Sequence, residues 1–139
     1  MNISFKIFAW ILISFVVFSC KKNNQQIPYV PVNFYLYTSS PQFNQLNAVG
    51  GWTYVNGGSK GIVIYHRSID EFVAFDRHST YNIDAGCQAN VDNSYITLTD
   101  SCSGSQFLLY DGSVAKGPAS FPLKAYQTSY DGNTLKVFN

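Results

Sequence analysis

The chain is poor in charged residues. Lysine, arginine, aspartate and glutamate make up 12% of its 139 residues, with nine basic residues against eight acidic ones. Removal of an N-terminal leader containing Lys6 would leave the remainder formally neutral. A nearly neutral chain without a basic patch offers no surface for a phosphate backbone, so nucleic acid is not an expected partner.

Long amphipathic periods are also absent, which leaves few segments that can be helical. Short runs rich in strand-forming residues alternate with turn signals instead, notably Asn56-Gly57-Gly58 between two such runs and Asp131-Gly132-Asn133 near the end. This pattern predicts an all-β fold, an antiparallel sandwich or small barrel of about eight to ten short strands. Strands are expected near residues 30–36, 52–55, 61–65, 72–75, 95–98 and 107–110.

The N-terminus has the features of a bacterial lipoprotein leader. An apolar run over residues 7–18 follows Lys6 and is too short to span a bilayer, but it fits the apolar region of a signal peptide. It ends in Val17-Phe18-Ser19-Cys20, which reads like a lipobox.

These features predict a signal peptide over residues 1–19, a lipidated Cys20 in a flexible tether over residues 20–27, and one β domain over residues 28–139. The protein is then expected in the bacterial cell envelope, held by lipid and facing the periplasm or the cell surface, with the outer membrane as the expected location. An envelope protein or a glycan is a candidate partner.

Cysteine and histidine are scarce. Once Cys20 is lipidated, Cys87 and Cys102 remain as one candidate disulfide, which would be worth about 3 kcal/mol in the chain-entropy treatment. The alternative is a zinc site formed by these two cysteines with His66 and His78. Its ligands would be loosely spaced, and an oxidising compartment favours the bridge, so no metal is expected.

Catalytic patterns are weak. Asp76, His78 and Ser79 contain the residue types of a hydrolytic triad, but residues so close along one segment rarely converge. The glycine-rich stretch at residues 57–60 lacks the spacing of a phosphate-binding loop and is better interpreted as a hairpin turn. The sequence therefore predicts a protein that is not an enzyme.

A family resemblance emerges from ordered segments along most of the chain. The sequence resembles Rieske iron-sulfur domains between Val32 and Phe138. Residues 61–65 and 71–77 match the strand pair before the first cluster loop. Residues 103–107 match the second cluster loop, and residues 111–113 match the hairpin that follows it. Residues 117–119 with 122–123 match a proline-containing loop. The resemblance implies the Rieske fold.

Rieske domains hold a two-iron, two-sulfur cluster through two cysteines and two histidines, arranged as C-x-H and C-x-x-H in two loops. Aligned on Asp76-Arg77 and on residues 103–105, these ligand positions fall at Ser79, Tyr81, Asp100 and Ser103. The resemblance thus implies a degenerate member without its cofactor, in which Tyr81 and Asp100 fill the vacated space. Many Rieske domains also carry a disulfide between the cluster loops, and Cys102 matches one half of it.

Three functions follow. The favoured one is a lipid-anchored, cofactor-free Rieske-like module with a binding or structural role. The second is a Rieske-type electron-transfer protein with a two-iron, two-sulfur cluster, which requires a different ligand alignment. The third is a carbohydrate- or peptide-binding lipoprotein, because strand alternation places some aromatic side chains outside: candidates are Tyr29, Tyr35, Tyr37, Tyr54, Tyr126 and Tyr130.

Overall fold

The structure is a computed structural model that describes residues 26–139. The predicted signal peptide, Cys20 and most of the tether lie outside the described residues, so the statements about them stay predictions. Within the described residues, no helix is long and apolar enough to cross a bilayer.

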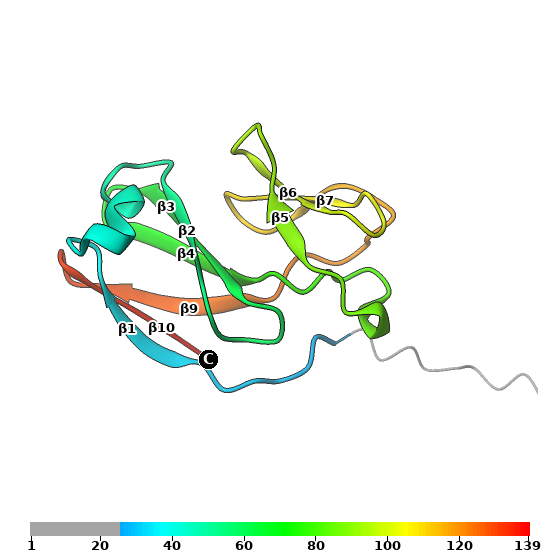
Figure 1. Cartoon of the computed structure of the whole chain (residues 1–139), viewed down its shortest axis with the longest axis horizontal. Coiled ribbons are helices and arrows are strands. Elements are labelled where there is room, and N and C mark those ends of the chain that lie inside the picture. The colour runs from blue at the N-terminus through cyan, green and yellow to red at the C-terminus, as the bar shows by residue number, and fades with distance from the viewer. Residues whose placement is uncertain (1–25) are drawn as a thin grey trace, which may run out of the picture.

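The described chain forms ten strands in two antiparallel sheets, which confirms the all-β prediction (Figure 1). A curved six-stranded sheet has the order β1-β10-β9-β4-β3-β2, made of β1 (Asn33–Tyr37), β10 (Thr134–Phe138), β9 (Ala125–Tyr130), β4 (Glu71–Asp76), β3 (Ile62–Ser68) and β2 (Trp52–Val55). A four-stranded sheet lies beside it in the order of the chain: β5 (Ala89–Val91), β6 (Thr97–Asp100), β7 (Gln106–Leu108) and β8 (Val114–Lys116). The smaller sheet is an insertion between β4 and β9.

The six-stranded sheet follows the predicted strand pattern closely. The predicted first strand is an edge strand, β1, in which Val32 just before it and Leu36 point into the core while Tyr35 stays exposed. The predicted hairpin is formed by β2 and β3, whose turn uses positive φ angles at Gly57 and Gly58. Glycine adopts this backbone conformation without a steric penalty, so the turn can close tightly.

The four-stranded sheet departs more from prediction. The strand expected at residues 95–98 begins at Thr97, because Tyr95 adopts a left-handed φ of 57° in the turn before it. The strand expected at residues 107–110 ends at Leu108, and β5 was not predicted at all. These strands are three or four residues long, which is too short for an alternating pattern to stand out.

Two short 3-10 helices complete the fold. The first, η1 (Pro41–Asn47), packs beside β2 and β3 and buries Leu46 completely. The second, η2 (Ile83–Ala85), lies in the long loop after β4.

Each sheet has its own apolar cluster. The cluster of the six-stranded sheet includes Ile62, Ile64, Leu135 and Val137, all with no exposed surface. The cluster at the four-stranded sheet is built around the fully buried Leu98 and Phe107, and it also contains Val63 and Phe75 from β3 and β4. The two sheets are therefore joined by apolar packing as well as by the chain.

Candidate functional site

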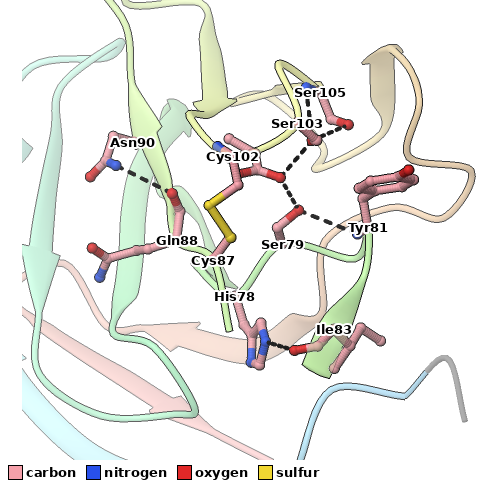
Figure 2. Close-up of a disulfide and its surroundings, with 11 residues drawn as sticks. His78, Ser79, Tyr81, Ile83, Cys87, Gln88, Asn90, Cys102, Ser103 and Ser105 are labelled. Carbon is pink, nitrogen blue, oxygen red and sulfur yellow. Dashed lines mark hydrogen bonds between the residues drawn. A yellow bond between two sulfur atoms is a disulfide. The ribbon is translucent and has the colours of Figure 1, made fainter. Parts of the chain in front are cut away.

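Two loops meet at one end of the four-stranded sheet and form what we call the loop site. One is the loop after β4, residues 77–88, and the other connects β6 to β7, residues 101–105 (Figure 2). A disulfide joins them between Cys87 and Cys102, with an S–S distance of 2.05 Å and a Cα–Cα distance of 6.2 Å. The structure thus contains the bridge that the cysteine count predicted.

Asp100 is the centre of the hydrogen-bond network in the loop site. Its side chain is completely buried at the end of β6. Its Oδ2 accepts hydrogen bonds from Ser79 Oγ at 2.7 Å and from Ser103 Oγ at 2.6 Å, and its Oδ1 accepts one from the Cys102 amide at 2.8 Å. Burial alone would raise the pKa of Asp100, but these hydrogen bonds outweigh it and lower the pKa below its ordinary value.

The network extends to a third loop, which precedes β9. Ser103 Oγ and Ser105 Oγ are hydrogen-bonded at 2.8 Å, and the buried Ser105 Oγ also accepts from the amide of Ala119 at 3.0 Å. A second link runs from Thr80 Oγ1 to the carbonyl oxygen of Phe121 at 2.6 Å. No local sequence pattern points to Thr80 or Ser105, because their partners lie 41 and 14 residues away.

Tyr81 borders the loop site and does not fill it. Its backbone amide donates to Ser79 Oγ at 3.2 Å, but its side chain keeps 42% of its surface exposed. Asp100 occupies the space between the loops with the hydroxyl groups of Ser79 and Ser103. The expectation that Asp100 fills the space agrees with the structure, whereas the same expectation for Tyr81 does not.

His78 holds the first loop against the β2–β3 turn. Its side chain is buried, with Nδ1 at 2.8 Å from Ser59 Oγ and Nε2 at 2.9 Å from the Ile83 carbonyl oxygen. Nε2 donates to the carbonyl oxygen, and Nδ1 is hydrogen-bonded to the hydroxyl group. Both ring nitrogens therefore serve structural hydrogen bonds.

Asp76, His78 and Ser79, which have the residue types of a hydrolytic triad, do not form a triad in the structure. The carboxylate of Asp76 accepts from Ser59 N at 2.6 Å, Tyr126 Oη at 2.7 Å and the backbone amide of His78 at 2.9 Å. Ser79 Oγ donates to Asp100, away from the imidazole. Among the described residues, His78 makes no hydrogen bond to this hydroxyl, as expected from the sequence spacing.

The alternative zinc set is not brought together either. Among the described residues, the ligand atoms of Cys87, Asp100 and Cys102 lie within 4.8 Å of one another, and neither histidine belongs to that group. His66 instead stacks on Phe72 with a 4.2 Å centroid distance, and no described residue bonds its ring nitrogens. The proximity of Asp100 to the cysteines follows from its hydrogen bond to Cys102.

The residues of the loop site do not fit a Rieske cluster. Such a cluster needs two thiolates and two imidazoles, whereas the four aligned positions carry two hydroxymethyl groups, a phenol and a carboxylate. Cys87 and Cys102 are bonded to each other, so neither offers a thiolate. Both ring nitrogens of the nearby His78 make hydrogen bonds.

Comparison with known proteins identifies the fold. No protein-family model and no curated protein matches the sequence. Among solved structures, the chain is similar to the plasma membrane Rieske protein PetC3 of the cyanobacterium Synechocystis PCC 6803, at 25% identity over 75% of this chain and 99% of that one, with a TM-score of 0.58. It is also similar to the ferredoxin of carbazole 1,9a-dioxygenase from Nocardioides aromaticivorans IC177, at 18% identity over 79% and 98% of the two chains, with a TM-score of 0.48. The described part of the chain is a Rieske-like domain.

Proposed function

We propose that this protein is a lipid-anchored, cofactor-free Rieske-like module of the bacterial cell envelope, with a binding or structural role and no catalytic activity. The observation that carries the proposal is the network around Asp100. Three of the four aligned ligand positions, Ser79, Asp100 and Ser103, bond to one another and leave neither a thiolate nor an imidazole for iron.

The disulfide takes over the task of holding the two loops together. It closes a separation of 15 residues, which corresponds to about 3 kcal/mol in the chain-entropy treatment. Exposed aromatic side chains, Tyr81 and Phe121, lie in loops joined by the Thr80 hydrogen bond. Aromatic side chains of this kind are suited to anchor a partner protein, which supports a docking role for this end of the domain.

Iron and acid-labile sulfide analysis tests the absence of the cluster. The protein, made with cluster assembly available and purified without oxygen, is expected to be colourless and free of iron. The matched variant Ser79→Cys, Tyr81→His, Asp100→Cys and Ser103→His restores the family's ligand pattern at the aligned positions. Iron and sulfide bound by this variant alone would support the alignment, and near two irons per chain in the unaltered protein would contradict the proposal.

Electron transfer through a Rieske cluster is the second candidate function. The similarity to a Rieske protein favours it, since 99% of the PetC3 chain is covered. It requires ligands other than the residues at the aligned positions. The same iron analysis therefore separates the two candidates.

The lipid anchor rests on the sequence features before Cys20. Two or more acyl chains on that cysteine would hold the protein firmly, because each buried methylene contributes about 0.8 kcal/mol. Cys20→Ser is expected to release the domain from the membrane fraction or to leave an uncleaved precursor. A Cys20→Ser protein that is still lipidated and sediments with membranes would contradict the anchor.

A carbohydrate- or peptide-binding face is the third candidate, and β1 supplies the observation that favours it. Tyr35 and Tyr37 are 62% and 56% exposed on one face of this edge strand, and Tyr29 precedes it with 72% exposed. Tyr126, by contrast, is buried. Loss of glycan or peptide binding in a Tyr35→Ala, Tyr37→Ala variant would support this function; unchanged binding would exclude these rings from it.

A further inference from the structure

An open groove of about 850 Å³ lies beside the first loop of the loop site. One wall is the β2–β3 turn with Lys60 and Gly61, and the other carries Gly86 and Gln88, which flank Cys87. Arg77 also lines the groove. Gln88 Nε2 donates to the carbonyl oxygen of Lys60 and so connects the two walls.

The charge of the groove is opposite to that of the domain around it. Three of the nine basic residues, Lys6, Lys21 and Lys22, precede the described part of the chain, whereas all eight acidic residues lie within it. The described domain is therefore formally negative. Nevertheless, the groove is lined by two cationic residues, Lys60 and Arg77, and by no acidic one. A local positive field in a negative domain selects for an anionic ligand.

Arg77 is held rigidly at the groove. Its side chain is 8% exposed, and its guanidinium lies 3.6 Å from the ring centroid of Tyr54. Nε donates to the carbonyl oxygen of Ala89 at 3.0 Å, and Nη2 donates to Asn90 Oδ1. Burial lowers the pKa of Arg77 from its ordinary value. Among the described residues, Nη1 has no hydrogen-bond acceptor, and no carboxylate lies within ion-pair distance of the guanidinium.

Lys60 supplies the second cation from a fixed backbone. Its amide donates to Asp76 Oδ1 at 3.2 Å, next to the Ser59 amide that donates to Oδ2 at 2.6 Å. The ammonium group of Lys60 has no carboxylate partner within ion-pair distance in the described part of the chain. Asp76 lies behind this wall, where its oxygens accept from four donors and it keeps its negative charge. It is not among the lining residues, and the two lining cations outnumber it.

The rest of the lining is suited to an uncharged ring. Phe43 and Val55 supply apolar surface, and the neutral polar side chains of the lining include the amides of Asn56 and Gln88. Pockets that combine an apolar wall with a few polar groups bind small organic molecules, whereas a bare inorganic anion would leave most of this groove empty.

We propose that the groove binds a sugar acid, a sugar ring that carries one carboxylate. The carboxylate lies between Arg77 Nη1 and the Lys60 ammonium, one ring face packs on Phe43, and ring hydroxyl groups bond to the side-chain amides. The site is independent of any cluster at the loop site, so failure of this proposal leaves the proposed cofactor-free role in place. The disulfide contributes by fixing the wall that carries Gly86 and Gln88.

The test is a titration followed by amide NMR shifts and calorimetry, with D-glucuronate as the probe. D-glucose tests whether a sugar ring binds without the carboxylate, and inorganic phosphate tests whether an anion binds without the ring. Lys60→Glu reverses the charge at an exposed side chain in the groove. Lys116→Glu is the matched control, because it makes the same charge change at an exposed position on β8.

Glucuronate is expected to shift the amides of the groove and to bind more tightly than glucose or phosphate. Lys60→Glu should weaken glucuronate binding by about tenfold or more, because loss of a charged hydrogen bond costs about 1.5–3 kcal/mol. Lys116→Glu should leave it unchanged. Equal binding of glucose or phosphate, an equal loss in both variants, or no loss in Lys60→Glu would overturn the proposal.

Discussion

The six-stranded sheet and the loop site are stabilised in different ways. The sheet buries a continuous apolar cluster, in which Ile64 and Leu135 have no exposed surface. The loop site instead relies on the Cys87–Cys102 disulfide and on a buried carboxylate with hydroxyl and amide donors. Because apolar packing does not depend on what the loops contain, the scaffold can keep its shape while the chemistry of the loops changes.

Apolar packing and polar hydrogen bonding meet within the four-stranded sheet. Leu98 and Phe107 are completely buried in it, so its strands are packed like those of the larger sheet. Asp100, two residues after Leu98 on β6, is equally buried, but its carboxylate accepts three hydrogen bonds. The change from apolar to polar stabilisation therefore occurs within one strand, at the point where β6 enters the loop.

Truncation of a buried side chain in the core of the six-stranded sheet should cause the largest loss of stability. Ile64→Ala removes a fully buried side chain and is expected to lower the free energy of unfolding by about 2–5 kcal/mol, measured by urea denaturation. Ile69→Ala is the control, since this isoleucine is 84% exposed and its loss should cost no more than about 0.5 kcal/mol. Similar losses for the two variants would contradict the assignment of the core.

Removal of the disulfide should cause the second-largest loss of stability. Cys87→Ser, Cys102→Ser is expected to lower the free energy of unfolding by about 3 kcal/mol, because the bridge restricts the unfolded chain. A reducing agent should destabilise the unaltered protein by a similar amount and leave the double variant unchanged. If the reducing agent destabilises both proteins equally, the bridge does not account for the difference.

Removal of the Asp100 carboxylate at the loop site should cause a smaller loss of stability, and the size of this loss should depend on pH. Asp100→Asn is expected to cost about 1–3 kcal/mol at neutral pH, because it leaves donors around a buried acceptor poorly paired. Asp84→Asn, at an exposed position in the first loop, is the control.

The sign of this pH dependence follows from the lowered pKa of Asp100. The stability that it contributes is fully present above the unfolded-state pKa of about 3.9, and it is lost as the pH falls through the folded-state pKa. The difference between Asp100→Asn and the unaltered protein should therefore shrink in urea denaturation at acid pH. A difference that is constant or grows with acidity would contradict the network.

The ion pair at the β3–β4 turn should have the smallest effect. Arg67 and Ser68 donate to Glu71 and lower its pKa to about 2, but the carboxylate is exposed, so solvent screens the pair. The contribution of Glu71 is present above its unfolded-state pKa and is lost as the pH falls toward 2. NMR titration should find the low pKa, and Glu71→Gln should leave the melting temperature nearly unchanged. An ordinary pKa would show that the pair does not persist in solution.

The same two regions differ in how much could be predicted from the sequence. The β2–β3 hairpin was predicted because its turn chemistry and its strand residues are adjacent in the chain. The loop site depends on contacts such as Ser79 with Asp100, which are 21 residues apart, and no local pattern reports such a pair. The positions of the network residues Ser79, Asp100 and Ser103 came from the family resemblance, while Thr80 and Ser105 were missed. The groove was missed for the same reason, since Phe43, Lys60, Arg77 and Gln88 come from different segments.

A disulfide and a carboxylate network hold together the two loops that correspond to the cluster loops of Rieske domains. The most direct test is to count free thiols by alkylation and mass spectrometry in the chain from Asn23 onward, made with cluster assembly available and unfolded without a reducing agent. No free thiol is expected, because Cys87 and Cys102 are bonded to each other. Two alkylated thiols per chain, released together with iron, would contradict it.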